Sequence, residues 1–178
     1  FDEYRETLTK TDNLLIYYAG HGFLDEEDNR GYWMPVDARP NRRSAWLSNA
    51  DITGTLKALK ANHVMVMADS CYSGTLTRGL SIKKRSSDYV REVADKKARV
   101  VITSGGLEPV ADKSGGNHSP FASVFLDVLN SNNGVLDGTN LFNKMRRPVM
   151  LKADQTPAYA DVRKAGHDGG DFLFVRRR

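Results

Sequence analysis

The chain is poor in cysteine: its 178 residues include one, which excludes a fold held by internal disulfides. A secreted domain of this size would more often carry an even number of cysteines, whereas a reducing compartment keeps a lone thiol available for chemistry. Long apolar runs of the roughly 18 residues needed for a membrane span are also lacking, and the first residues do not resemble a signal peptide. We therefore expect a soluble, cytoplasmic protein without membrane partners.

The basic excess is small and scattered, with a formal net charge of +4. It gathers at residues 83–85, 96–97 and 176–178, and no basic helix interleaved with aromatic residues accompanies it. We interpret these charges as solvated surface and expect no nucleic-acid partner. With 19.8 kDa and 40% hydrophobic residues, the chain suits one globular domain.

The lone cysteine, Cys71, follows an apolar run at residues 63–68 and lies in the segment DSCYSG. A second apolar run, residues 14–19, ends in the same way at Gly20-His21-Gly22. Both runs read as strands, and parallel strands of an α/β sheet open their carboxyl ends onto a common edge. A thiol and an imidazole can meet there, which indicates a cysteine hydrolase.

These segments resemble the caspase-like cysteine peptidases, a group that includes caspases, metacaspases, paracaspases and bacterial relatives. The separation of fifty residues between His21 and Cys71 is similar to that in caspases. Further similar stretches are GYWMPVDA (residues 31–38), ITSGG (102–106), HSPF (118–121) and GGDFLFV (169–175). The resemblance covers nearly the whole chain.

The resemblance implies an α/β/α sandwich with a mostly parallel, six-stranded sheet whose first strands precede the histidine strand. Few residues precede that strand here, so we expect the N-terminal strands to be missing from this chain. A separate N-terminal fragment or a regulatory domain is then a candidate partner, besides a protein or peptide substrate. Within one domain at 1–178, we expect a large-subunit-like part (1–76), a linker (77–98) and a small-subunit-like part (99–178).

The alternation of patterns along the chain predicts the same α/β class. We expect strands at residues 14–19, 32–36, 63–68, 99–103, 157–162 and 171–175, the first of them buried on both faces. We expect helices at residues 1–11, at 51–60 after a cap at Ser48 or Asn49, from about Ser73, from Ser119, and from Asp137 or Thr139 to 151. Residues 77–97 read as a polar linker or as a solvated helix around 88–96.

Cys71 is the predicted nucleophile, since a turn that leads into a helix N-terminus favours the thiolate. The alternative is an inert core cysteine. The resemblance makes His21 the group that protonates the leaving amine and activates water, and it assigns the oxyanion hole to the backbone N–H groups of Gly22 and Cys71. His118 remains an alternative base, whereas His63 lies at the wrong strand end and His167 in a glycine-rich loop.

Asp69 shares a strand face with Cys71, because side chains alternate along a strand. Metacaspases and paracaspases, which cleave after Arg or Lys, have an aspartate at the matching position, so the resemblance implies a basic P1 residue in the S1 pocket. Glu108 is a candidate second carboxylate of that pocket, with Asp112 as its competitor. The alternatives are a structural role for Asp69 in capping the next turn and plain loop charges at the other two.

Several positions depart from the metacaspase pattern. Tyr72 stands where those enzymes have histidine. The paired acids that metacaspases have just before the helix after the Pro-Val-Asp segment appear here only as Ala50-Asp51, and Arg78 falls near another position expected to be acidic. We therefore predict no metal site and no cofactor, although the acidic cluster at 25–28 could attract cations. The prediction is an Arg/Lys-directed cysteine endopeptidase. The rival readings are a caspase-fold pseudoenzyme or scaffold, and a small-molecule amidase or transferase.

Overall fold

The structure is a computed structural model that describes residues 1–27, 29–39, 42–70, 77–79, 88–106, 117–162 and 164–177. Cys71, Glu108 and Asp112 lie outside these described residues, as does the helix predicted near Ser73. The described part of the chain contains no helix that combines the length and apolar character needed to cross a bilayer.

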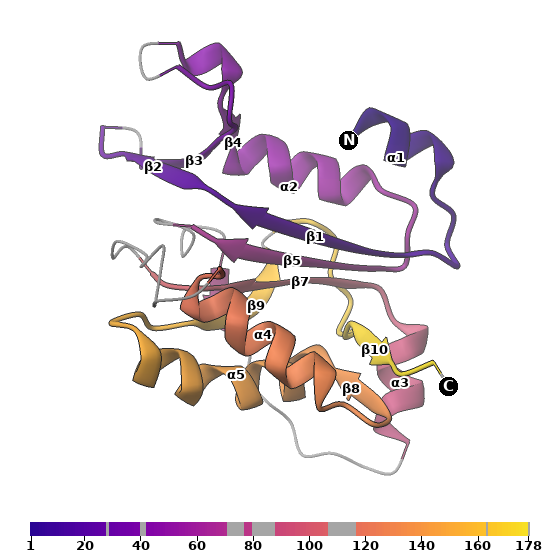
Figure 1. Cartoon of the computed structure of the whole chain (residues 1–178). Coiled ribbons are helices and arrows are strands. Elements are labelled where there is room, and N and C mark those ends of the chain that lie inside the picture. The colour runs from indigo at the N-terminus through magenta and orange to yellow at the C-terminus, as the bar shows by residue number, and fades with distance from the viewer. Residues whose placement is uncertain are drawn as a thin grey trace.

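A five-stranded mixed sheet forms the centre of the molecule, in the order β1-β5-β7-β9-β6. β1 (Asn13–Ala19), β5 (His63–Asp69) and β7 (Ala98–Thr103) run parallel. β9 (Ala158–Val162) is antiparallel to both β7 and β6 (Thr77–Gly79). The carboxyl ends of β1, β5 and β7 therefore meet at one edge of the sheet, on the left in Figure 1.

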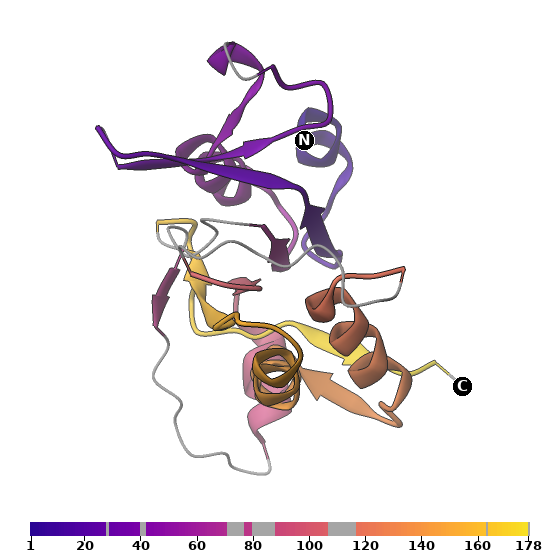
Figure 2. The ribbon, with the colours of Figure 1, turned by 60° about the vertical axis from the view of Figure 1, so that its left-hand side comes forward.

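Helices cover both faces of this sheet. α1 (Asp2–Thr7) and α2 (Asn49–Ala58) lie on one side, and α3 (Tyr89–Asp95), α4 (Pro120–Asn130) and α5 (Gly138–Lys152) lie on the other, as Figures 1 and 2 show. The arrangement confirms the prediction of a mostly parallel α/β sheet flanked by helices.

Two hydrophobic cores, one on each face, hold the layers together. Val64 and Val66 of β5 pack with α2, whereas Met65 and Met67 belong to the core that α4 and α5 cover. All four side chains are at most 1% exposed, because successive residues of a central strand point to opposite covered faces. On the helix side of these cores, α2 buries residues such as Ile52 and α4 buries residues such as Phe121.

Two smaller sheets flank the main one. β2 (His21–Asp25), β3 (Arg30–Met34) and β4 (Leu47–Ser48) form an antiparallel sheet, followed along the chain by α2; a short 3₁₀ helix (Arg43–Ala45) precedes β4. β8 (Val135–Asp137) pairs with β10 (Leu173–Val175). The β2–β3 hairpin was not predicted, because the glycines around His21 read as the end of a strand.

Three predictions about elements need correction. β1 is not buried on both faces: its residues alternate between exposed and half-buried, since β1 is an edge strand of the described sheet. α1 ends at Thr7, where the predicted helix continued to residue 11. β3 covers residues 30–34 and not 32–36, because it pairs with β2 in the hairpin.

The helix caps and the segment at 77–97 follow the predictions. Side-chain oxygens of Ser48, Ser119 and Asp137 accept hydrogen bonds from the first turns of α2, α4 and α5, which confirms the N-terminal caps. Residues 77–97 include β6 and α3, and α3 corresponds to the helix expected around 88–96.

Candidate active site

The predicted histidine lies just beyond the end of β1. Ala19 of β1 is in register with Asp69 of β5, and the Gly20 N–H donates a hydrogen bond of 3.4 Å to the Asp69 carbonyl. His21 follows directly as the first, exposed residue of β2. The pairing thus brings His21 to the edge at which the chain continues from Asp69 towards Cys71.

The turn that carries His21 is held by Tyr18, a residue that sequence reasoning did not single out. Its phenol lies 2.7 Å from the His21 carbonyl, to which it donates, and it accepts a 3.0 Å hydrogen bond from the Met34 N–H. The Tyr18 ring stacks on Trp33 with a centroid distance of 4.3 Å. Burial raises the pKa of Tyr18, so the phenol remains a donor at neutral pH.

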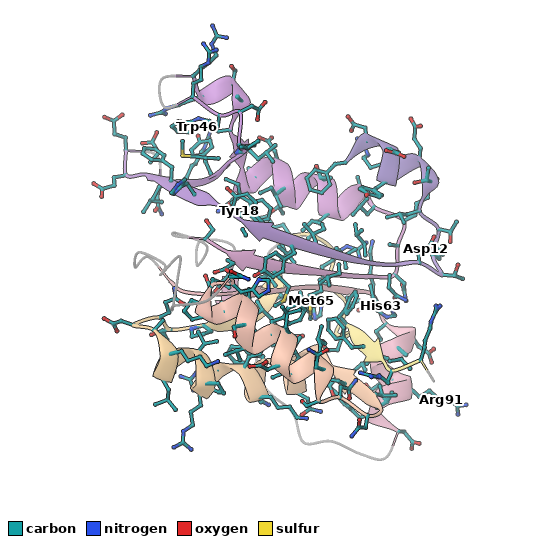
Figure 3. The ribbon with its side chains drawn as sticks, viewed as in Figure 1. Asp12, Tyr18, Trp46, His63, Met65 and Arg91 are labelled. Carbon is teal, nitrogen blue, oxygen red and sulfur yellow. The ribbon has the colours of Figure 1, made fainter. Side chains whose placement is uncertain are left out.

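Gly20 is required by the same contact. A Cβ atom at Gly20 would lie 2.7 Å from the Tyr18 hydroxyl oxygen and 2.9 Å from its ring carbon. Figure 3 shows Tyr18 on the α2 side of the sheet, opposite to Met65. The close approach between the turn and this anchored ring excludes any side chain at position 20.

Asp69 is the most unusual charged group at this edge. The residue is 7% exposed, and its Oδ2 atom accepts hydrogen bonds from Ser119 Oγ at 2.5 Å and from the Tyr17 hydroxyl at 3.2 Å. Its other oxygen, Oδ1, is buried and has no hydrogen-bond partner among the described residues. A buried carboxylate oxygen without a donor is costly, and a cationic ligand would satisfy it.

The pKa of Tyr17 is affected by the neighbouring Asp69. Burial and, next, the neighbouring Asp69 carboxylate raise the pKa of the Tyr17 phenol far above its ordinary range. Tyr17 therefore keeps its proton and acts as a hydrogen-bond donor. Two neutral hydroxyl groups hold Asp69, and within the described parts of the chain no Lys or Arg forms an ion pair with it.

The remaining histidines fall into two groups. The Nδ1 atom of His63 lies 2.7 Å from Asn13 Oδ1 at the amino ends of β5 and β1, away from the carboxyl edge (Figure 3). Nδ1 of His167 accepts from the Arg99 N–H near the amino end of β7, and burial lowers the pKa of His167. His118 is exposed and directly precedes Ser119, so it remains the alternative base.

The first residue of the acidic cluster at 25–28, Asp25, makes structural contacts. Asp25 is buried, accepts from the Glu27 N–H at 3.1 Å and forms an ion pair with Arg43. The described residues contain no group of three His, Cys, Asp or Glu side chains placed to hold a metal ion.

The site residues predicted from the sequence include His21, Gly22 and Asp69, but the prediction did not include the residues that contact them. Gly22 lies in β2 opposite Trp33. Ser119 was predicted as a helix cap and not as a partner of Asp69, fifty positions away in the sequence. Alternation along the strand could have placed Tyr17 on the α4 side, but its contact with Asp69 depends on the register between β1 and β5.

The comparisons with known proteins agree with this architecture. The family model of the caspase domain matches residues 2–165, from α1 to just beyond β9. No curated protein gives a significant match to the chain.

Proposed function

The chain belongs to the caspase-domain family of cysteine peptidases, and from this premise we propose that it cleaves proteins or peptides after Arg or Lys through a Cys71–His21 dyad. Asp69 carries the specificity part of the proposal. Its buried, unpartnered Oδ1 atom is the single observation that favours a cationic substrate group.

The dyad is supported by the register between β1 and β5. In the proposed reaction the Cys71 thiolate attacks the scissile carbonyl carbon, and His21 gives a proton to the leaving amine. The backbone N–H groups of Gly22 and Cys71 stabilise the oxyanion. Water activated by His21 then hydrolyses the thioester, which releases the acid product and regenerates the thiol.

The proposed S1 pocket uses electrostatic selection. A desolvated carboxylate attracts a guanidinium or ammonium group and repels the carboxylate of an acidic P1 residue. We further propose Glu108 as a second carboxylate of this pocket.

The dyad is tested with fluorogenic peptides on the wild type, Cys71→Ala and His21→Ala. We expect both variants to lose turnover by several orders of magnitude while circular dichroism and thermal denaturation remain close to wild type. His118→Ala is the matched control and should retain activity. Substantial activity in either folded dyad variant would contradict the assignment. A folded wild type without peptidase activity would instead favour a scaffold.

The specificity proposal is tested with peptides that differ only at P1. Loss of a desolvated charge partner typically costs 2–5 kcal/mol, so Asp69→Asn should lower kcat/KM for Arg-P1 peptides by about 30-fold or more. Asp127→Asn removes a surface carboxylate of α4 that is 71% exposed in its side chain, and it controls for net charge. A wild-type preference for Asp over Arg at P1 would show that the pocket has been misassigned.

A further inference from the structure

We propose that Ser119 is a positioning residue for substrate specificity: its hydroxyl, assisted by that of Tyr17, orients the Asp69 carboxylate towards a basic P1 side chain. The proposal rests on the proposed function, since it concerns how the same pocket is built. It assigns to the residue that caps α4 a role that a helix cap alone does not have.

The Ser119 hydroxyl accepts one hydrogen bond and donates another. Its oxygen accepts a 2.9 Å hydrogen bond from the Ala122 N–H in the first turn of α4. Its proton points to Asp69 Oδ2 at 2.5 Å, because an ionised carboxylate can only accept. Ser119 therefore connects the start of α4 directly to the end of β5.

Tyr17 reaches the same carboxylate oxygen from a different element, the strand β1. Its hydroxyl lies 3.2 Å from Asp69 Oδ2, and its ring stacks against Phe125 of α4 with a centroid distance of 6.2 Å. Two donors from different elements thus fix one oxygen and restrict rotation of the carboxyl group. The second oxygen, Oδ1, is left without a partner among the described residues.

Two neutral hydroxyl groups are suitable partners for a carboxylate that binds a cation. A Lys or Arg partner would orient Asp69 but would also cancel most of its attraction for a basic ligand. Neutral hydroxyl groups supply orientation and keep the full negative charge available. Hydrogen bonds to charged groups are stronger than those between neutral groups, so each hydroxyl contributes measurably to the position of the carboxylate.

A simple capping role makes a different prediction, and two variants separate the alternatives. Glycine and asparagine both function as helix caps nearly as well as serine, but only asparagine offers an N–H donor to Asp69. Ser119→Gly should therefore raise KM for Arg-P1 and Lys-P1 peptides about tenfold with a small change in kcat. Ser119→Asn should remain within about threefold of the wild type, with both variants similar in Tm.

A double-mutant cycle tests whether the effect passes through Asp69. In an Asp69→Asn background, Ser119→Gly should have little further effect on KM, because the charge that it positions is gone. Tyr17→Phe keeps the stacked ring, removes the second hydroxyl and should give a smaller loss, about threefold, consistent with its longer hydrogen bond. Ser131→Ala, at the other end of α4, is the control for general effects on the helix.

The outcomes are distinct. Unchanged KM in a folded Ser119→Gly variant, or an equal loss with and without Asp69, would overturn the proposal and leave Ser119 as a cap only. If Ser119→Gly does not fold, the effect of Tyr17→Phe on KM, with and without Asp69, decides in the same way. A wild type that does not prefer basic P1 residues would overturn the proposed function itself, independently of these variants.

Discussion

At the scale of single residues, the Tyr18 phenol and the Gly20 backbone form one unit that presents His21. The phenol is hydrogen-bonded to the His21 carbonyl and to the Met34 N–H, and its ring is stacked on Trp33. Because these hydrogen bonds hold the hydroxyl and Trp33 packs on the ring, moving the phenol aside to make room for a side chain at position 20 would break these contacts. The position of the proposed base therefore depends on a glycine.

Gly20→Ala should displace His21 and lower kcat by about two orders of magnitude or more, since small displacements of catalytic groups are costly. The nearest clashing atom is the Tyr18 hydroxyl oxygen at 2.7 Å, so the loss should be smaller in a Tyr18→Phe background than in the wild type. Steady-state kinetics and thermal denaturation of both variants and their combination measure this coupling.

Gly54→Ala provides the matched control. Apart from its chain neighbours and the surrounding backbone of α2, no atom lies within 4 Å of a Cβ built at Gly54, which is inside that helix. This substitution should stabilise the protein by about 0.5–1 kcal/mol and leave kcat unchanged. If Gly20→Ala has normal kinetics, Tyr18 does not restrain the turn as the contacts indicate.

The same residues show what the sequence can predict. His21 and Asp69 follow from local patterns, because each lies at the end of an apolar run, and runs of this kind form parallel strands. The contact of Tyr18 with the His21 turn and that of Ser119 with Asp69 could not be predicted in this way, since they depend on the β2–β3 hairpin and on the packing of α4. Local pattern thus predicts the ends of the strands but not the partners that hold them.

At the scale of elements, Arg99 links the beginning of β7 to the end of α2. The side chain is 0% exposed, and its guanidinium donates to the carbonyl oxygens of Leu56, Leu59, Ala61, Asn62 and Ala98. Burial lowers the pKa of Arg99 to about 10, so it remains charged at neutral pH. It acts as a C-terminal cap for α2 with carbonyl groups in place of a carboxylate partner.

Arg99→Met should lower the free energy of unfolding by about 2–4 kcal/mol, because several buried carbonyl groups lose their donor. Arg99→Lys keeps the charge but has three donors in place of five, and it should lie between methionine and the wild type. Urea denaturation measures both variants. Arg91→Met on the exposed face of α3 (Figure 3) is the control and should change stability by less than about 0.5 kcal/mol.

An Arg99→Met variant as stable as the wild type would show that the cost of burying the guanidinium equals the benefit of its five hydrogen bonds. The sequence offered little sign of this role. Arg99 stands in an apolar strand pattern, and four of its five partners become neighbours only when α2 packs on the sheet.

At the scale of the whole molecule, the sheet interleaves strands from the part of the chain before residue 80 with strands from the part after residue 97. β1, β5 and β6 precede residue 80, whereas β7 and β9 follow residue 97. In the sheet, β7 and β9 lie between β5 on one side and β6 on the other. A break in the chain between β6 and α3 would therefore leave two fragments joined by β-ladders on both flanks.

We expect the enzyme to cut itself in this interval, because Lys83, Lys84 and Arg85 match the basic residue that the proposed pocket selects. Arg78 is the contrasting site: it is paired with Asp161 in the ladder between β6 and β9, and a hydrogen-bonded strand resists proteolysis. Mass spectrometry of purified protein should detect N-terminal fragments that end at residues 83–85 in the wild type and not in Cys71→Ala.

The interleaved strands predict how the cut protein behaves. The two fragments should elute together in size-exclusion chromatography and separate in denaturant, because both β-ladders pair strands across the break and the ladder between β5 and β7 buries apolar strand surface. Trypsin digestion of Cys71→Ala gives the same test without self-cleavage, and a variant with glutamine at positions 83–85 is the uncut control. Fragments that separate in native buffer would contradict the strand order, and an active wild type that remains uncut would show that cleavage is not needed for activity.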